Sequence, residues 1–228
     1  FYQATQKDLS VVASDITQNM KLVLNHRTAP KVPVVWATRM SMNFPLVWQE
    51  VTWQAEWGTY RGADISGDRV VDGGLVSNFP LELFVSDDET VVEVMGPKKH
   101  DNVLGLLIDD DIPVPNAPPQ PQEKDFLTDL TEFATIQRLW ELVDTMTKTN
   151  DKAVATDFEE LVARLPAGGY TTFEFDMTDE RRNALINSGC TAMTTYFDHL
   201  SITSFSIGPG AGPTRTEIAN KVALKMLK

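Results

Sequence analysis

The stretch that decides the fold runs from Val70 to Pro80 and reads VVDGGLVSNFP. It places an aspartate, Asp72, directly after a short apolar strand and directly before two glycines. A carboxylate in this position is delivered to the edge of a sheet, where α/β folds bind their ligands. The glycines predict a sharp turn with positive φ and leave no side chain between the carboxylate and its target. The alternative is a plain Asp-Gly turn between two strands, which the tripeptide alone favours.

Two upstream segments extend this pattern. Residues 8–15, DLSVVASD, form a β-branched strand closed by a polar turn, and residues 36–45, WATRMSMNFP, favour a short helix that Pro45 ends. Together with the Asp-Gly-Gly stretch and its continuation through Asn78 and Pro80, these segments resemble the patatin-like phospholipases. The resemblance covers residues 8–84.

This resemblance implies a lipid acyl hydrolase, a phospholipase or esterase, that uses a Ser-Asp dyad. Asp72 matches the family's catalytic aspartate, which activates the nucleophilic serine directly. Gly73, Gly74, Asn78 and Arg39 match positions that support the site. For Arg39 a structural ion pair is the favoured alternative.

The other half of the family's site is not in this sequence. The family has a Gly-x-Ser-x-Gly elbow that exposes the serine and a glycine-rich loop that stabilises the oxyanion, both upstream of the segment that starts at residue 8. Neither pattern occurs in the 228 residues, which begin with Phe1. A carboxylate base without its nucleophile cannot transfer an acyl group. We therefore expect a missing amino-terminal half of the same domain to supply the serine, because Asp72 and its glycines are intact. The alternative is a catalytically inactive patatin-like binding or scaffold module.

Apolar runs without alternation predict strands at residues 91–95 and 103–108. Such strands are buried on both faces, which indicates a parallel or mixed sheet covered by helices. The expected fold class is α/β, a three-layer α/β/α patatin-like domain that is incomplete in this chain and carries a helical carboxyl-terminal extension. The expected divisions are residues 1–111 for the carboxyl-terminal half of the catalytic domain, 112–122 for a proline-rich loop and 123–228 for a helical flanking or cap region.

Beyond the proline-rich loop the spacing of apolar residues is mainly helical. The expected elements are helices over 126–146 and 157–165, a strand over 170–175, and a helix from 179 to about 188 that Thr178 caps and Gly189 interrupts or kinks. Residues 216–227 form a weak amphipathic helix. We expect it to dock on the domain, with a weak membrane-surface contact as the alternative.

Aromatic side chains crowd residues 46–62, and we expect them to cover the core. For one set of apolar residues two interpretations remain open, the lining of an acyl-chain pocket and ordinary core packing. The set is Met40, Met42, Phe44, Trp48 and Trp53.

The composition, 42% hydrophobic and 23% charged, is that of a globular protein, and the net charge of −12 argues against a nucleic-acid partner. No cofactor is expected. No metal site is expected either, because Cys190 has no partner at ligand spacing and residues 109–111 have the pattern of an acidic solvated turn. The histidines, His26, His100 and His199, have the pattern of ordinary surface or partly buried residues. The expected partners are a lipid ester substrate and the missing amino-terminal half, in the cytoplasm, with a peripheral membrane contact as an open option.

Overall fold

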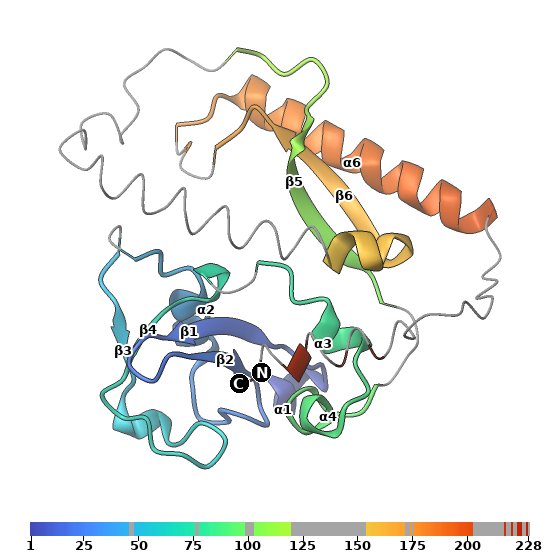
Figure 1. Cartoon of the computed structure of the whole chain (residues 1–228). Helices are drawn as coiled ribbons and strands as arrows, with labels where there is room; N and C mark the ends of the chain where they lie inside the picture. Colours follow the sequence, from blue (N-terminus) through green and yellow to red (C-terminus); the bar gives the residue numbers. More distant parts are fainter. Residues whose placement is uncertain are drawn as a thin grey trace. The chain divides into compact units, whose positions relative to one another are not determined.

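The computed structural model describes residues 1–45, 48–75, 78–98, 103–119, 154–171, 174 and 176–202, and five residues of the last stretch, 217, 220, 223, 224 and 227. These residues fall into two compact units (Figure 1). Unit 1 holds the described residues of 1–101 and 213–228 together with Val154, and unit 2 holds those of 102–119 and 155–202. The expected helix over 126–146 and His100 lie outside the described residues. The expected domain boundaries at 111 and 122 stay a prediction.

Unit 1 is built on a four-stranded sheet. The strands are β1 (Val11–Asp15), β2 (Met20–Leu24), β3 (Val51–Thr52) and β4 (Arg69–Asp72), in the order β2-β1-β4-β3. All three pairings are antiparallel, whereas a parallel or mixed sheet was expected here. The reason is the short connection from β1 to β2, residues 16–19, because a parallel pair needs a much longer crossover. The strand β2 was not anticipated from the sequence.

Side chains from the two faces of this sheet enter two separate cores, because successive residues of a strand point to opposite faces. Ala13, Leu22 and Val70 belong to one core, which α2 (Val34–Ser41) covers with Ala37 and Met40. This core also takes the aromatic residues Trp53, Trp57 and Tyr60, around the 3₁₀ turn η1 (Ala55–Trp57). The aromatic cover expected for residues 46–62 is therefore confirmed at these three residues.

The second core lies around Val23 of β2 and is covered by helices. It takes Leu83 of α3 (Glu82–Val85) together with Val91 and Val94 of α4 (Glu89–Met95). With α2 covering the first core, unit 1 has the three-layer α/β/α arrangement that was expected. A further short helix, α1 (Tyr2–Thr5), begins the chain.

The strand expected at residues 91–95 is wrong, since these residues belong to the helix α4. Asp88 supplies the reason, because its side chain accepts a hydrogen bond from the N–H of Thr90 at 2.9 Å and caps the helix. Val91 and Val94 are three residues apart and point to the same core. A short apolar run of this kind fits a buried helix as well as a strand.

The last stretch of the chain docks on unit 1, as the favoured interpretation of residues 216–227 expected. All five described residues there are helical. Ala223 is fully buried in the second core and Leu227 packs against it. Asn220 accepts hydrogen bonds from the hydroxyl of Ser86 at 2.7 Å and from the N–H of Asp87 at 3.0 Å. The segment thus contributes structure to unit 1 at each of these points.

The outer edge of β2 is closed by side chains. The N–H of Val23 donates to the hydroxyl of Tyr60 at 3.1 Å, and its carbonyl accepts from the hydroxyl of Thr28. The same Thr28 oxygen accepts from the N–H of Asn25 at 3.1 Å. Main-chain groups that face away from β1 are therefore paired at two consecutive outward positions.

Unit 2 pairs β5 (Gly105–Pro113) with β6 (Val162–Gly168) in parallel, next to the long helix α6 (Asp179–Ile202). The 3₁₀ turn η4 (Glu159–Leu161) leads into β6. The strand expected at residues 103–108 is present but continues through the three aspartates, so the acidic turn expected there is wrong. A helix over 157–165 is also wrong, because β5 offers a strand partner that the local pattern cannot reveal.

The helix α6 begins as expected and ends later. The N–H of Arg181 lies 3.4 Å from the hydroxyl of Thr178, which caps the helix. Gly189 does not interrupt it, because α6 continues for a further 13 residues to Ile202. The strand expected over 170–175 is wrong at residues 170, 171 and 174, the ones described there, which are in irregular structure.

Arg181 accounts for the irregular segment before α6. Its side chain is 2% exposed and pairs with Glu174, and it also donates to the carbonyls of Gly169 and Pro118. The guanidinium lies over the ring of Tyr170, 4.2 Å from the ring centroid. A buried guanidinium needs several acceptors, and this segment bends around Arg181 to supply them.

Candidate active site

Asp72 is the last residue of β4, at the carboxyl end of the strand where the sequence placed it. The chain then enters the 3₁₀ turn η2 (Gly73–Leu75). Because of this turn, the N–H of Gly74 points back and donates to Oδ1 of Asp72 at 2.8 Å. The carboxylate is half-buried, and one of its oxygens is held by the main chain of its own loop.

The electrostatics of Asp72 suit a base. Burial raises the pKa of the Asp72 carboxyl above its ordinary value, and the hydrogen bond from Gly74 offsets part of that rise. A carboxylate with a raised pKa accepts a proton more readily than a solvated one. It remains ionised only above that raised value, so its capacity as a base is lost as the pH falls.

The two glycines are required for space and not for positive φ, which neither of them has. A Cβ at Gly73 would lie 2.5 Å from the carbonyl oxygen of Val12 in β1. A Cβ at Gly74 would lie 2.3 Å from the amide oxygen of Asn78 and 3.2 Å from Oδ1 of Asp72. The expected conformational reason for the glycines was therefore wrong. The expectation that no side chain stands between the carboxylate and its target stays a prediction.

These distances also place Asn78. Its amide oxygen lies close over Gly74, on the side of the loop that faces Oδ1 of Asp72, and its side chain is exposed. The structure thus brings Asp72, Gly73, Gly74 and Asn78 together in one loop. Their roles in a reaction remain predictions.

Arg39 reaches the same place by another path. It lies in the last turn of α2 and donates to Oδ1 of Asn43 at 2.7 Å, so its partner is an amide and not the carboxylate of an ion pair. Asn43 is completely buried, and its main-chain carbonyl accepts the N–H of Asp72 at 3.0 Å. Asn43 is the residue that the sequence analysis missed. No spacing or charge pattern in the sequence marks Asn43. Its side chain is hydrogen-bonded to Arg39, four residues earlier in the chain, and to Val70, 27 residues later.

The core-packing and acyl-pocket interpretations of the methionine and tryptophan set have different outcomes for different residues. Met40 and Trp53 are buried in the first core, so core packing is confirmed for them. Met42 is 56% exposed and Trp48 is 46% exposed, and the guanidinium of Arg39 lies 5.6 Å from the ring centroid of Trp48. The acyl-pocket interpretation stays a prediction for this exposed pair.

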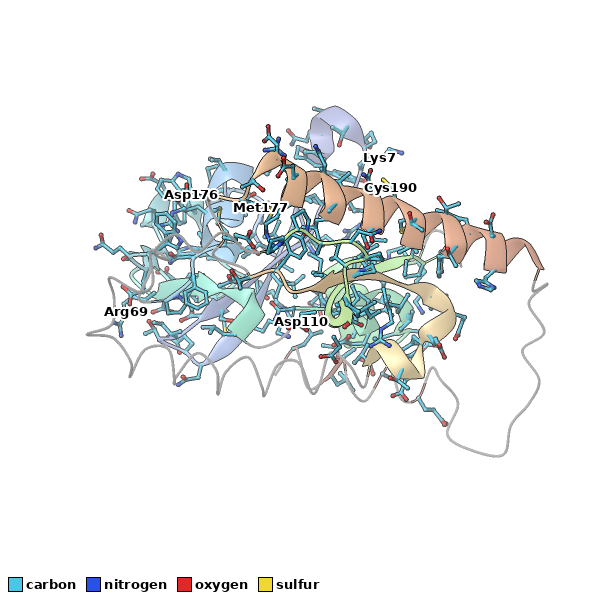
Figure 2. All side chains as sticks on the ribbon, turned by 90° about the horizontal axis from the view of Figure 1, so that it is seen from above. Lys7, Arg69, Asp110, Asp176, Met177 and Cys190 are labelled. Carbon is cyan, nitrogen blue, oxygen red and sulfur yellow. The ribbon has the colours of Figure 1, made fainter. Side chains whose placement is uncertain are left out.

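Other candidate groups have structural partners. Nδ1 of His26 lies 3.2 Å from Oδ1 of Asp8, and the ring stacks on Tyr2, as in an ordinary partly buried histidine. It lines a shallow pocket of about 80 Å³, which is lined by residues other than Asp72. His199 lies in α6, and Cys190, marked in Figure 2, is exposed on the same helix.

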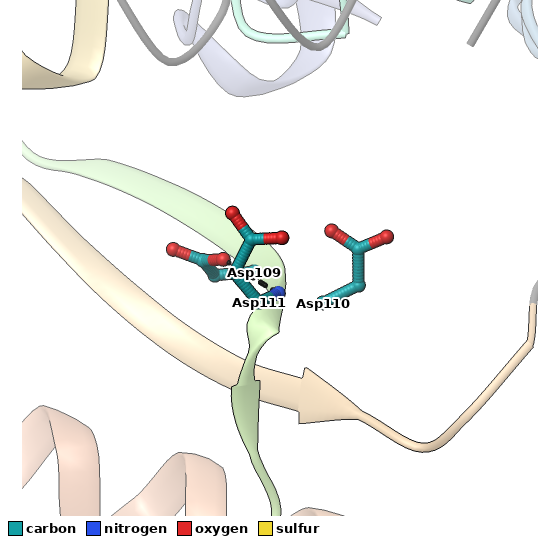
Figure 3. Close-up of side chains that lie close together, drawn as sticks. All are labelled: Asp109, Asp110 and Asp111. Atoms are coloured by element: carbon teal, nitrogen blue, oxygen red, sulfur yellow. Dashed lines mark hydrogen bonds between the residues drawn. The ribbon is translucent and has the colours of Figure 1, made fainter. Parts of the chain in front are cut away.

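The three consecutive aspartates of β5 bring carboxylate oxygens within 4.8 Å of one another (Figure 3). Asp109 is buried, and its Oδ2 pairs with Nε of Arg164 on β6 at 2.7 Å. Its Oδ1 accepts the N–H of Asp111 at 3.0 Å. These contacts explain the buried member of the group as part of the β5–β6 pairing.

None of the described helices combines the length and the apolar composition that crossing a bilayer requires. This finding agrees with the absence of long apolar runs in the sequence.

Comparison with known proteins gives two findings. Residues 1–85 match the family model described as patatin-like phospholipase. The chain is also 26% identical over 188 residues to an uncharacterized protein of Bacillus subtilis, YqhO, covering 79% of this chain and 54% of that protein. The chain thus spans about half the length of the curated relative it matches. The matched stretch contains β1 to β4, Arg39 and the loop of Asp72. Residues 1–85 are therefore similar to part of a patatin-like phospholipase domain.

Proposed function

We propose that this chain supplies the general base of a serine lipid acyl hydrolase, and that the base is Asp72. The observation that carries the proposal is the arrangement of its carboxylate, half-buried at the end of β4 with Oδ1 held by the N–H of Gly74 and its pKa raised by burial. A general base needs a fixed direction and a pKa closer to the working pH than that of a solvated carboxyl. Asp72 has both properties.

The proposed reaction uses a serine from the part of the protein outside this chain. The serine hydroxyl attacks the ester carbonyl of the lipid while its proton passes to the free oxygen, Oδ2, of Asp72. The protonated Asp72 then gives this proton to the leaving alcohol, and an acyl-enzyme remains. Water attacks the acyl-enzyme with Asp72 again as the base, which releases the fatty acid and restores the serine.

The loop residues have supporting roles in this proposal. Gly73 lets the loop lie against β1, where a Cβ would meet the carbonyl oxygen of Val12 at 2.5 Å. Gly74 leaves space beside the carboxylate, because a Cβ there would lie 3.2 Å from Oδ1 of Asp72. Asn78 lies beside Asp72 at the surface, next to Gly74, where it shapes the rim of the carboxylate. The exposed side chains of Met42 and Trp48 offer an apolar surface for the acyl chain.

The proposed partners are a lipid ester and the amino-terminal half of the same domain. A peripheral contact with a lipid surface is part of the proposal, because the substrate resides there. Three exposed apolar residues in the first turn of α2 suit such a contact, Val34, Val35 and Trp36.

The decisive experiment compares the complete protein with its Asp72→Asn variant on a short-chain ester and on phospholipid vesicles. Asparagine preserves the shape and the acceptor for the N–H of Gly74 but cannot take a proton at neutral pH. We expect the variant to fold as the wild type does and to lose about 100-fold or more in kcat. An equally active variant would remove Asp72 from the mechanism. A wild type that hydrolyses no ester would instead favour the inactive binding module.

A further inference from the structure

The strand that carries Asp72 has a gap in its pairing on one side. β3 is two residues long and pairs only with Arg69 and Val70 of β4. The carbonyl of Arg69 faces β1, where it accepts the N–H of Ile16 at 2.9 Å. Main-chain groups alternate along a strand, so the carbonyl of Val70 and the N–H of Asp72 both face the side of β3. Val70 still pairs with Val51 there, whereas the N–H of Asp72 lies beyond the end of β3.

Asn43 contacts both groups. Its Nδ2 donates to the carbonyl of Val70 at 3.3 Å, and its own carbonyl accepts the N–H of Asp72 at 3.0 Å. One buried residue therefore pairs the N–H of Asp72 where β3 has ended, and its side chain is anchored to β4 at Val70. The N–H of Gly74 holds the side chain of Asp72, and the carbonyl of Asn43 holds its main-chain N–H.

Arg39 fixes the orientation of the Asn43 amide. Its guanidinium donates to Oδ1 of Asn43 at 2.7 Å, which leaves Nδ2 directed at the carbonyl of Val70. The opposite orientation would place Oδ1 against that carbonyl and Nδ2 against the guanidinium, two contacts between like groups. Arg39 is itself held by the carbonyl of Gln49 at 3.5 Å and by the ring of Trp48.

We propose that Asn43 is a positioning residue for Asp72, and that Arg39 acts on Asp72 through Asn43. This inference rests on the proposed function, in which Asp72 takes the proton of a serine. Proton transfer requires donor and acceptor to lie within hydrogen-bond distance and in line, so a small displacement of β4 at Asp72 lowers kcat. Substrate binding does not use this contact, so KM is unaffected.

The test uses the complete protein with Asn43→Ala, and Asn25→Ala as the matched control. Asn25 is also a buried asparagine of unit 1, and its Nδ2 donates to the carbonyl of Val94 at 2.9 Å, in contact with α4 and not with β4. We expect Asn43→Ala to lower kcat on a soluble ester by about 10- to 100-fold with KM within about twofold of the wild type. Asn25→Ala should lose stability and retain kcat. Equal kcat in Asn43→Ala and the wild type would overturn the inference.

A milder variant covers the case in which Asn43→Ala does not fold. Arg39 is only half-buried, so Arg39→Gln should fold and should lower kcat in the same way, by a smaller factor. In the double variant the two losses should not multiply, because both substitutions act at one point. A double variant that loses the full product of the two factors would show that Arg39 does not act through Asn43.

Hydrogen exchange at the N–H of Asp72 separates this inference from the proposed function. Loosening of Asn43 should speed that exchange in Asn43→Ala and leave it unchanged in Asn25→Ala, whether or not the protein hydrolyses esters. An inactive wild type would therefore end the proposed function while exchange still tests the positioning. An active wild type, an inactive Asp72→Asn variant and unchanged exchange and kcat in Asn43→Ala would end the positioning alone.

Discussion

Replacement of the two glycines after Asp72 by alanine should separate the fold of the loop from its chemistry. At Gly73 an added Cβ would lie 2.5 Å from the carbonyl oxygen and 2.6 Å from the carbonyl carbon of Val12. Both atoms belong to the main chain of β1, whose next residue, Ala13, pairs with Asp72 in the sheet. Neither atom can yield without moving β1 away from β4.

The magnitude follows from two opposing effects. Forcing a methyl group into a rigid, well-packed place costs about 1–3 kcal/mol. Alanine also restricts the unfolded chain relative to glycine, which returns about 0.4–1 kcal/mol. We therefore expect Gly73→Ala to lower the free energy of unfolding by about 1–2 kcal/mol, measured by urea denaturation with the fluorescence of Trp53 and Trp57 as the signal.

Gly74→Ala should behave differently, because its nearest neighbour is the exposed amide of Asn78, which can swing away. Its free energy of unfolding should stay within about 0.5 kcal/mol of the wild type. The new methyl group would crowd Oδ1 of Asp72 and displace Asn78, so hydrolysis should fall by about tenfold or more. The control is Gly189→Ala in α6, where a Cβ meets nothing within 4 Å and helix formation should gain about 0.5–1 kcal/mol. A Gly73→Ala protein as stable as the wild type would refute the close approach of β1 and the loop.

Three further predictions concern stability. The pKa of Asp15 is raised by burial and by the neighbouring carboxyl of Asp68, although two N–H groups oppose the rise. A raised pKa means that the stability this group contributes is greatest in acid and is lost as the pH rises. Asp15→Asn should therefore raise the denaturation midpoint at neutral pH and not in acid, and the same gain at both pH values would argue against the carboxyl pair. Arg181→Met should destabilise unit 2 by about 3–5 kcal/mol, because the buried carboxylate of Glu174 loses its partner; calorimetry showing less than about 1 kcal/mol would contradict this role. Ala223→Asp should undock the last helix and speed its proteolysis, and wild-type resistance would speak against the docking.

The sequence predicted the part of the fold that local signals mark. Asp-Gly-Gly after an apolar run placed the end of β4, and Thr178 before a charged turn placed the start of α6. The sequence did not reveal β2 and β6, because each is a strand by virtue of a partner distant in the chain or across a tight turn. It also misassigned residues 91–95, where the cap at Asp88 outweighs the β-branched composition of the run.

The candidate site was predictable only as far as it is written in consecutive residues. Asp72, the glycines and Asn78 form one motif, and the structure groups them in one loop. Asn43 lies within the segment quoted for the helix before Pro45, but its importance comes from the short length of β3. No local pattern states that a neighbouring strand stops after two residues and leaves the N–H of Asp72 to be paired. Such a residue can be found only once the sheet is seen.

The closed edge of β2 has a consequence for how the protein behaves in solution. An unpaired edge strand invites another chain to add to the sheet, which is a common start of aggregation. At Val23 and Asn25 the outward groups are already paired with Tyr60 and Thr28, so an incoming strand would first have to displace two buried hydroxyl groups. Because the ring of Tyr60 belongs to the first core, that displacement would open the core as well. Tyr60 and Thr28 thus protect this edge of the sheet from edge-to-edge association.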